Sequence, residues 1–325
     1  MDILKDKIII LTGGTGSFGN KFTEIILKKH KPKAIRIFSR GEKKQYDMSL
    51  KFNNERLRFF IGDVRDKERL HRAMTDVDIV VHAAALKQVP ACEYNPIEAI
   101  RTNIDGATNI IDAAIDNGVD KVMAISTDKA VHPVNLYGAT KMTAEKLFIQ
   151  GNSYSGKSDT KFSCVRYGNV IGSRGSVIPL FLNQKKKGTL TITDTKMTRF
   201  FIKLEQGVDL VIKGIGRMRG GEIFIPKIPS MRIIDMAKAI APNAKIKIIG
   251  IRPGEKIHEI LLTEDEARHS KEFDDFFIIE PEHPFWTEDK HIKGGKNLPN
   301  NFRYTSGNNT KWVTKKQLMS FIKEL

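Results

Sequence analysis

The sequence predicts an α/β fold in which a doubly wound parallel sheet is followed by a smaller, irregular C-terminal lobe. From residue 6 to about residue 170, short β-rich runs alternate with longer helical stretches, the pattern of a parallel sheet with helices on both faces. A glycine-rich turn separates the first run from the first helix. Beyond about residue 172, glycine and proline divide the chain into shorter pieces. We therefore place one domain at residues 1–172 and a second at residues 173–325, and we allow segments of the second to return to the first.

Six continuous apolar runs predict the strands of the sheet, because strands buried on both faces carry few polar side chains. Their ranges are Lys7–Leu11, Ala34–Phe38, Leu57–Ile61, Ile79–His82, Lys121–Ile125 and Lys161–Arg166. In the second domain we expect a helix near Lys203–Lys213, a strand near Glu222–Ile225 and a helix near Ile233–Ile240. The tail from about Lys271 is rich in aromatic residues, so we expect it to pack onto the main body or onto a neighbouring subunit. These aromatic residues are Phe273, Phe276, Phe277, Phe285, Trp286 and Trp312.

Composition excludes several classes of protein. The 325 residues include 54 Lys+Arg and 38 Asp+Glu, a net charge of +16, which suits phosphorylated small-molecule ligands. The lysines are spread along the chain and their densest run, Lys185–Lys187, is short, so we expect no nucleic acid partner. Neither a membrane span of ~18 apolar residues nor a secretory signal is present, which predicts a cytoplasmic protein without a membrane partner. Cys92 and Cys164 are too few for a disulfide framework, and no residues stand at metal-ligand spacing beside His132 or His258.

The glycine-rich turn predicts a dinucleotide site. It reads Thr12-Gly13-Gly14-Thr15-Gly16-Ser17-Phe18-Gly19 and lies between a buried strand and an amphipathic helix. Such glycines allow a tight turn and let a pyrophosphate approach the backbone N–H groups at the start of the helix. Because this turn opens a chain that goes on to repeat the strand–helix unit, we interpret the first domain as a Rossmann-type fold. The residues expected to contact the cofactor here are Gly13, Thr15, Gly16, Ser17, Phe18 and Gly19.

The end of the second predicted strand favours NADP over NAD. An NAD site usually carries an acidic residue there, whereas this chain has Ser39, Arg40 and Lys43, which can hold a 2′-phosphate. Glu42 lies close enough to keep NAD open as the alternative. After the next two strands, Asp63 and Val64 fit an adenine contact and Ala83 leaves room for the cofactor to pass. An aspartate at a strand end is also a common helix cap, and small residues also serve helix–sheet packing.

Two polar segments after the fifth strand predict catalytic chemistry. Thr127, Asp128 and Lys129 follow that strand directly. Tyr137 and Lys141 stand four positions apart (i and i+4) on a helical pattern, so both side chains emerge on one face and the ammonium can lower the pKa of the phenol. A phenolate so formed is a general base for a hydroxyl group whose carbon gives a hydride to nicotinamide. The plainer interpretation of Asp128 and Lys129 is a surface ion pair.

With these motifs in place, the chain resembles the extended short-chain dehydrogenase/reductase family. Within it, the sequence closely resembles the inverting UDP-N-acetylglucosamine 4,6-dehydratases of the pseudaminic acid pathway over roughly residues 5 to 260. Lys129 is the discriminating residue, since retaining dehydratases usually have a glutamate there and sugar-nucleotide 4-epimerases lack the Asp-Lys pair. The segments that carry the resemblance are Thr12–Gly19, Ala83–Pro90, Ser126–Ala130, Arg166–Val170, Met197–Phe200 and Arg252–Lys256.

The resemblance implies a hydro-lyase reaction in which the cofactor ends as it began. Tyr137 takes the proton of the 4-hydroxyl group as the C4 hydride passes to NADP, Lys129 removes the C5 proton, and Asp128 protonates the departing 6-hydroxyl group. Return of the hydride to C6 and of a proton to the opposite face of C5 gives UDP-2-acetamido-2,6-dideoxy-β-L-arabino-hexos-4-ulose. Lys129 must lose its proton for this, and we expect burial or the charge of Lys141 to lower its pKa. A retaining dehydratase, a C4 epimerase and a non-catalytic NADP-binding module remain the alternatives.

The resemblance also implies the substrate contacts. Lys87 is expected between nicotinamide and sugar, Asn169 at the phosphates, and Arg252 at the diphosphate, which suits a planar guanidinium. A homo-oligomer, with a hexamer as one form, is implied as well. The residues expected to line the nucleotide pocket are Val177, Ile178, Pro179, Leu180, Phe181, Thr195 and Arg199.

Overall fold

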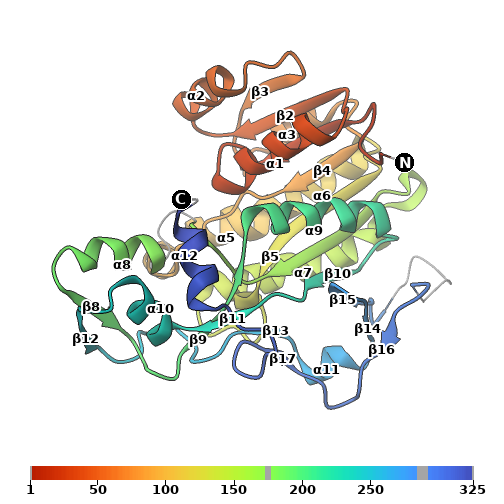
Figure 1. The fold of residues 1–325 in the computed structure, drawn as a ribbon. Coiled ribbons are helices and arrows are strands. Elements are labelled where there is room, and N and C mark those ends of the chain that lie inside the picture. Colours follow the sequence, from red (N-terminus) through yellow and green to blue (C-terminus); the bar gives the residue numbers. More distant parts are fainter. Residues whose placement is uncertain (1, 173–176, 284–291, 324–325) are drawn as a thin grey trace.

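A computed structural model describes residues 2–172, 177–283 and 292–323, and its centre is a sheet of mainly parallel strands (Figure 1). Across the described residues the strand order is β16-β14-β15-β10-β6-β5-β4-β1-β2-β3. The strands of this sheet are β1 (Ile8–Thr12), β2 (Ala34–Ser39), β3 (Leu57–Ile61), β4 (Ile79–His82), β5 (Lys121–Thr127), β6 (Lys161–Tyr167), β10 (Ile223–Pro226), β14 (Ser270–Glu272), β15 (Phe276–Ile279) and β16 (Lys296–Asn297). The predicted α/β fold with a Rossmann-type parallel sheet is confirmed.

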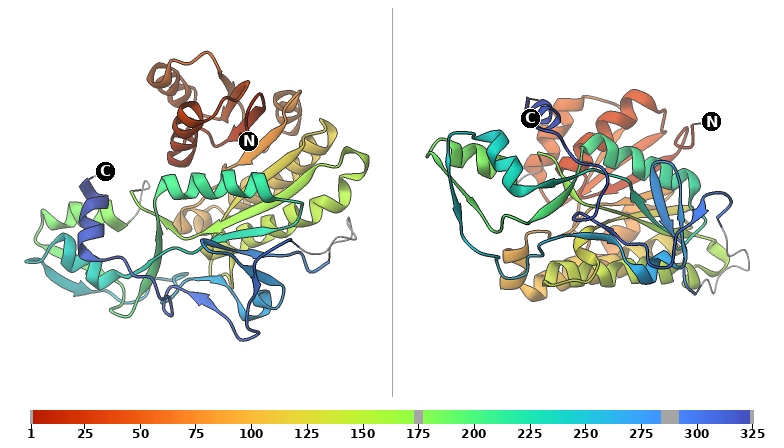
Figure 2. Two further views of the ribbon diagram at one scale, coloured as in Figure 1. Left: turned by 45° about the vertical axis from the view of Figure 1, so that its right-hand side comes forward. Right: turned by 60° about the horizontal axis from the view of Figure 1, so that its bottom comes forward.

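Helices cover both faces of the sheet. Each of the longer helices buries one face against the sheet, as expected for a doubly wound fold. Helices α1 and α9 pack together on one face, whereas α3, α6 and α7 pack in a row on the other (Figures 1 and 2). The helical elements are α1 (Ser17–Lys29), α2 (Glu42–Phe52), α3 (Lys67–Met74), α4 (Val89–Tyr94), α5 (Pro96–Ile100), η1 (Arg101–Asp105), α6 (Gly106–Asp116), η2 (Asp128–Ala130), α7 (Leu136–Tyr154), η3 (Gly156–Ser158), α8 (Val177–Lys185), α9 (Leu204–Arg217), α10 (Ile233–Ile240), α11 (Glu264–Ala267) and α12 (Lys315–Lys323).

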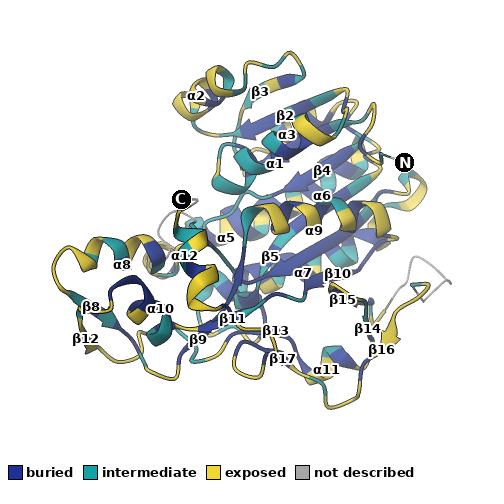
Figure 3. Cartoon of the chain, viewed as in Figure 1, coloured by how far each residue is buried: buried dark blue, intermediate teal, exposed yellow. Residues whose placement is uncertain are grey.

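The core of the sheet forms where the sequence is most continuously apolar. All six strands predicted before residue 172 are present, with ends that differ by at most two residues. Their side chains are almost all buried, as Figure 3 shows for the central strands. Phe22 of α1, Phe148 of α7, Phe162 of β6 and Phe224 of β10 are among the largest fully buried side chains, so both helix layers contribute to one core.

The second half of the chain divides between this sheet and a smaller lobe. Strands β10, β14, β15 and β16 belong to the main sheet, where β15 pairs antiparallel to β10, and helix α9 packs on that sheet. The lobe has its own apolar core built from α8, α10, α12 and neighbouring strands. The described strands outside the main sheet are β7 (Asn169–Val170), β8 (Thr189–Ile192), β9 (Thr198–Ile202), β11 (Ser230–Arg232), β12 (Lys245–Ile248), β13 (Ile260–Leu262) and β17 (Tyr304–Thr305), of which β13 and β17 pack against the core of the main sheet. In Figure 1 the lobe lies at the lower left.

The aromatic tail packs largely onto the main sheet. Phe276 and Phe277 are buried in β15, and the rings of Phe273 and Phe276 stack with centroids 4.9 Å apart. Trp312 is partly exposed, whereas Phe285 and Trp286 lie outside the described residues. Of the helices described, none has the length and apolarity to cross a membrane.

The topology places polar segments at one edge of the sheet. The strand order reverses between β1 and β4, and in open α/β sheets ligands bind at the carboxyl ends of strands near such a reversal. The glycine-rich turn after β1, the Ala83–Gln88 loop after β4 and the Thr127–Lys129 segment of β5 and η2 all meet there. This edge is therefore the place to look for the predicted site.

Candidate active site

The glycine-rich turn is shaped to admit a phosphate group. Gly13 has φ +65°, and a Cβ atom on it would lie 2.9 Å from the carbonyl oxygen of Ala83, so the turn and the segment after β4 touch through backbone atoms. Helix α1 follows Gly16 without any side chain capping its first N–H groups. Open N–H groups at a helix start favour an anion. The residues present thus fit a dinucleotide pyrophosphate.

The predicted basic and polar side chains of the adenosine site lie at or after the carboxyl ends of β2 and β3. The hydroxyl group of Thr15 donates to that of Ser39 at 3.2 Å, which joins the turn to the end of β2. Arg40 is exposed and lies 3.8 Å from the carboxylate of Asp63, while exposed Lys43 pairs with Asp47 at 2.6 Å. Val64, the residue after Asp63, is buried. The structure brings the predicted adenosine residues to one place, with a guanidinium at the strand end.

Asp128 and Lys129 form a part-buried ion pair and not a surface pair, since the aspartate is buried and the lysine side chain is 23% exposed. Asp128 has no exposed area, and the Nζ atom of Lys129 lies 3.0 Å from its Oδ1 atom. The hydroxyl group of Thr127 also donates to Oδ1, at 3.0 Å. The second oxygen, Oδ2, is buried without a hydrogen-bond partner among the described residues. Buried polar atoms are nearly always paired, so this oxygen indicates a position that a ligand or a transferred proton completes.

The charges around this pair correct one expectation. Burial opposes the charge on Lys129, but the carboxylates of Asp128 and Glu259 outweigh burial and raise the pKa of Lys129 above its usual value. The prediction that burial or Lys141 lowers that pKa was wrong. Burial together with Glu259 raises the pKa of Asp128, although Lys129 opposes the shift. Lys129 is therefore held as an ammonium next to the carboxylate of Asp128, and that carboxylate binds a proton more readily than an exposed aspartate does.

Tyr137 lies on α7 beside this pair, and Lys141 follows it one helical turn later. Burial raises the pKa of Tyr137 to about 12, and the effects that oppose it are the charge of Lys129 and a hydrogen bond with Thr127. The prediction that Lys141 makes a low-pKa phenol was thus wrong, because burial dominates and Lys129 is the opposing cation. Lys141 itself is buried, which lowers its own pKa.

Close backbone contact fixes Tyr137 against the Asp128–Lys129 turn. A Cβ atom on Gly138 would lie only 2.2 Å from the carbonyl oxygen of Lys129, so glycine is required where α7 crosses η2. Asn135 caps α7 by accepting from the N–H of Gly138 at 2.8 Å, and it donates to the carbonyl oxygen of Gly254 at 2.8 Å. The segment that holds Gly254 is thereby anchored to the same turn.

Comparison with known proteins agrees with this geometry. The polysaccharide biosynthesis protein family matches residues 9–281, which is most of the chain. The chain belongs to this family, a branch of the extended short-chain dehydrogenase/reductases. It is 52% identical over 324 residues, 97% of each chain, to the UDP-N-acetylglucosamine 4,6-dehydratase (inverting) of Campylobacter jejuni. It is also 44% identical, over 98% of this chain and 95% of the other, to a protein of Rickettsia conorii named UDP-glucose 4-epimerase.

Solved structures of related proteins show the same architecture. The X-ray structure of Pen from Bacillus thuringiensis is 40% identical and covers all of both chains with a TM-score of 0.90. DesIV, a dTDP-glucose 4,6-dehydratase from Streptomyces venezuelae, is 21% identical, and its crystal structure holds NAD. That match covers 77% of this chain and 86% of DesIV with a TM-score of 0.70, which shows a shared fold.

The predicted substrate residues of this family member divide into three groups. The Oδ1 atom of Asn169 is buried without a hydrogen-bond partner among the described residues, as expected of a group that binds a ligand. Lys87, Thr195 and Arg252 are exposed and lie in loops and turns between the helices and strands. Arg199, in contrast, is buried and turns its guanidinium toward the carbonyl oxygens of Thr198 and Ile257 and toward Glu259.

Helix α8 supplies the remaining predicted nucleotide contacts. Ile178 and Phe181 are buried in the core of the lobe, so their side chains are committed to packing. Val177, Pro179 and Leu180 are partly or fully exposed on the same helix. Only these three therefore present side chains that a nucleotide could reach. Among the described residues, no group of His, Cys, Asp and Glu is arranged to hold a metal ion.

Two buried polar residues at the site escaped the sequence analysis. Asn103, in the π-helical turn η1, exchanges hydrogen bonds with both backbone groups of Leu86 and donates to Thr140 on α7 at 3.0 Å. A π-helical turn is often found at functional sites, and this one connects the loop after β4 to α7. Glu259 lies next to Lys129 at 3.5 Å. Neither has a local sequence signal, since each stands among other polar residues.

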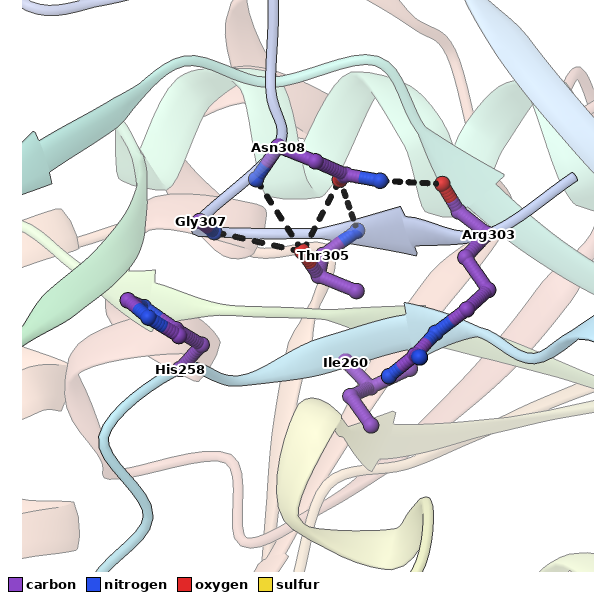
Figure 4. Close-up of a pocket in the computed structure, with 6 residues that line it drawn as sticks. All are labelled: His258, Ile260, Arg303, Thr305, Gly307 and Asn308. Atoms are coloured by element: carbon purple, nitrogen blue, oxygen red, sulfur yellow. Dashed lines mark hydrogen bonds between the residues drawn. The ribbon is translucent and has the colours of Figure 1, made fainter.

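A pocket next to Glu259 lies between β13 and β17 (Figure 4). It is lined by His258, Ile260, Arg303, Thr305, Gly307 and Asn308, none of which was predicted for the site. The side chain of Asn308 accepts hydrogen bonds from the N–H and hydroxyl groups of Thr305, at 2.9 and 2.8 Å. These contacts stabilise the turn whose Ser306 bonds the backbone of Glu259. We therefore interpret the pocket as part of the structure that supports the site.

Proposed function

We propose that this protein catalyses the NADP-dependent 4,6-dehydration of UDP-N-acetylglucosamine with inversion at C5, a hydro-lyase reaction. The observation that carries the proposal is the pair of buried Asp128 and part-buried Lys129, 3.0 Å apart, beside Tyr137 at the carboxyl end of β5. An acid and a base held together next to a phenol suit an elimination across C5 and C6 better than a simple oxidation. The relative from Campylobacter jejuni, named for this reaction, supports the proposal.

The pair acts as an acid and a base after one internal proton transfer. Moving the proton from Nζ of Lys129 to Oδ1 of Asp128, a distance of 3.0 Å, gives a neutral amine and a neutral carboxylic acid. The amine takes the proton at C5, the C5–H electrons form the C5–C6 double bond, and the C6–O6 bond breaks. Asp128 protonates O6, which leaves as water. The pair is then again an ammonium and a carboxylate, so the elimination restores the ionisation that the structure favours.

Tyr137 acts on the 4-hydroxyl group. The phenol oxygen, near Thr127 and the charge of Lys129, is placed to exchange a proton with that hydroxyl. The residues of the glycine-rich turn would hold NADP, which would supply hydride chemistry between C4 and C6, and a proton from solvent would add to the opposite face of C5 as C6 gains the hydride. Lys141 lies one helical turn further along α7 on the same face as Tyr137 and is assigned to the ribose of the cofactor. Asn169 and Arg252 are assigned to the phosphates of the substrate, and Lys87 to the space between sugar and nicotinamide.

Proton NMR of UDP-N-acetylglucosamine incubated with the protein and NADP in D₂O tests this function. We expect a new C6 methyl signal, incorporation of deuterium at C5, and the couplings of the L-arabino product. A methyl signal with D-xylo couplings would instead identify a retaining dehydratase and remove the role of Lys129 in inversion. No conversion of the sugar would refute the proposal and favour a binding module.

The second candidate is a C4 epimerase, which the name of the Rickettsia conorii relative favours. Epimerisation at C4 moves a hydride off and back onto one carbon and needs no acid for a leaving hydroxyl group. The same NMR experiment separates the two, since epimerisation yields no methyl group and no deuterium on carbon. The Asp128–Lys129 pair would have no acid–base role in that reaction.

The wider setting follows from the chemistry of the product. A 4-keto-6-deoxy sugar nucleotide is a substrate for an aminotransferase, and we propose that the product enters a pseudaminic acid pathway in the cytoplasm. We further propose that the protein is a homo-oligomer, with a hexamer as the form to test. Light scattering of the full chain measures the assembly, and a monomer at micromolar concentration would contradict this part.

A further inference from the structure

Glu259 is a buried carboxylate at the centre of a cluster of three cations. It is 3% exposed and directly precedes β13. Its oxygens lie 3.5 Å from Nζ of Lys129, 3.6 Å from Nε of Arg199 and 3.7 Å from Nζ of Lys256. These cations come from three separate segments of the chain. A buried carboxylate is costly unless it is compensated, so this arrangement needs a reason beyond packing.

The backbone of Glu259 is fixed as firmly as its side chain is surrounded. Its N–H donates to the hydroxyl of Ser306 at 2.9 Å, and its carbonyl oxygen accepts from the N–H of Ser306 at 2.8 Å. The hydroxyl of Ser306 in turn lies 2.7 Å from that of Thr198 on β9. The tail of the chain thus fixes the carboxylate against β9 and η2. Its Oε2 atom is nevertheless buried without a hydrogen-bond partner among the described residues.

The position of Glu259 places Lys129 between two carboxylates. Asp128 lies on one side at 3.0 Å and Glu259 on the other at 3.5 Å. We propose that Glu259 is a positioning residue for the dehydration, holding the amine of Lys129 beside Asp128 and setting how many protons the pair carries. This inference rests on the function proposed above and names a residue that acts through Lys129.

The chemistry requires such a residue, because the reactive pair must hold one proton and no more. With two protons, Lys129 has no lone pair for C5. With none, Asp128 has no proton for O6. Glu259 favours retention of the shared proton, and Arg199 and Lys256 still compensate its charge after Lys129 passes that proton to Asp128. The groups that face Lys129 are thus Asp128, Glu259, Arg199, Lys256 and, from α7, Tyr137.

The substitution Glu259→Gln tests the proposal through the pH dependence of kcat. Gln has the same shape but no charge. Loss of a negative charge 3.5 Å from Lys129 lowers the proton affinity of the pair. The acid limb of the profile, where the pair gains a second proton, is expected to move to lower pH by about one unit or more. Glu259→Asp keeps the charge, so its acid limb is expected near that of the parent. An acid limb unchanged in Glu259→Gln would overturn the proposal.

A second variant gives a shift of opposite sign. Lys256→Met removes a cation from the same cluster, so the acid limb is expected to move to higher pH, and this variant also serves if Glu259→Gln does not fold. Glu222→Gln is the matched control: Glu222 is likewise buried, but it bonds Ser163 at the far end of β6. Its acid limb is expected to equal that of the parent. A shift in the control, or Lys256 and Glu259 variants that shift alike, would contradict a charge effect at Lys129.

A direct titration of Lys129 separates this inference from the proposed function. Competitive acetylation with acetic anhydride, read by mass spectrometry over a pH series, reports the proton affinity of the amine in the full chain. In Glu259→Gln the midpoint is expected at lower pH than in the parent. If the parent fails to convert UDP-N-acetylglucosamine, the proposed function fails, yet the acetylation midpoint still confirms or refutes the effect of Glu259 on Lys129.

Discussion

Two buried charge clusters lie on adjacent strands of the sheet, and they differ in how completely their hydrogen bonds are satisfied. Arg166 on β6 binds both oxygens of Glu145 at 3.0 and 2.7 Å, and it also contacts Glu266 at 2.9 Å. Its third nitrogen donates to the carbonyl oxygen of Leu261 at 3.0 Å. In the cluster around Lys129, one strand away after β5, Glu259 lies 3.5 to 3.7 Å from its cations, and Asp128 Oδ2 and Glu259 Oε2 have no hydrogen-bond partner among the described residues.

This difference indicates which cluster is structural and which is chemical. A bidentate, fully paired guanidinium gains geometric specificity, and here it ties α7 to β6 and α11. Carboxylate oxygens left unpaired in the interior cost stability, and such costs accumulate at functional sites. Both clusters contain a cation between two carboxylates, so charge alone does not separate them. The unsatisfied oxygens do.

The largest expected effect is loss of dehydration in Lys129→Met. Met fills a similar volume without the amine, so the C5 proton has no base and the rate of methyl formation is expected to fall by about 10³-fold or more. Lys146→Met, on the exposed face of α7, is the matched control and is expected to retain the parent rate. Product formation by Lys129→Met within tenfold of the parent would place the chemistry elsewhere.

A substitution in the fully paired cluster around Arg166 is expected to lower the free energy of unfolding and to leave kcat nearly unchanged. Arg166→Met leaves the buried Glu145 and the part-buried Glu266 without their cation, and breaking a buried ion pair costs about 3–5 kcal/mol of unfolding free energy. Urea unfolding measures this loss. The folded fraction is expected to keep a kcat close to that of the parent.

A compensating variant sharpens that result. Adding Glu145→Gln and Glu266→Gln to Arg166→Met removes the uncompensated charges, and part of the lost stability is expected to return. If Arg166→Met unfolds like the parent, or if the triple variant is no better than the single one, the cluster does not stabilise the fold in the way described.

Gly138→Ala probes how closely the two catalytic segments must approach. The added Cβ atom would lie 2.2 Å from the carbonyl oxygen of Lys129, so α7 and η2 must separate. A misplacement of about 1 Å at a reacting group is expected to lower kcat by about 10- to 100-fold. Gly207→Ala in α9 is the control, because its Cβ atom would have ordinary contacts at 3.9 Å with Tyr167. Equal rates in both variants would remove the role assigned to this crossing.

The fold was predictable from local patterns, and the pairing of distant segments was not. Alternating apolar runs such as Ile79–His82 carry their own signal, and helix Ile233–Ile240 was predicted at its observed ends. The return of β14 and β15 to the edge of the main sheet depends on antiparallel pairing with β10, a contact between segments about 50 residues apart. No pattern within Phe276–Ile279 specifies which strand it joins.

The candidate site divides in the same way. Asp128, Lys129 and Tyr137 were identified because they are close in sequence, and the structure brings them together. Glu259 was missed because its meaning comes from cations that stand 130, 60 and 3 positions earlier in the chain. The direction of both pKa shifts was also wrong: the carboxylates of Asp128 and Glu259 outweigh burial and raise the pKa of Lys129, whereas burial raises the pKa of Tyr137.

The smallest expected effect concerns a charge pair of a third kind, on the surface. Arg40 is 60% exposed and lies 3.8 Å from Asp63, so Arg40→Ala is expected to change the unfolding free energy by no more than about 1 kcal/mol. Its effect should appear in cofactor choice: the dissociation constant for NADP is expected to rise about tenfold, because a charge-assisted contact to the 2′-phosphate is lost, while that for NAD stays unchanged. Binding titrations with both dinucleotides measure this. Lys43→Ala, which breaks the exposed pair with Asp47, is the matched comparison and shows whether the second basic side chain shares the task. A parallel loss of NAD and NADP in Arg40→Ala would mean that Arg40 holds the adenosine and does not read the 2′-phosphate.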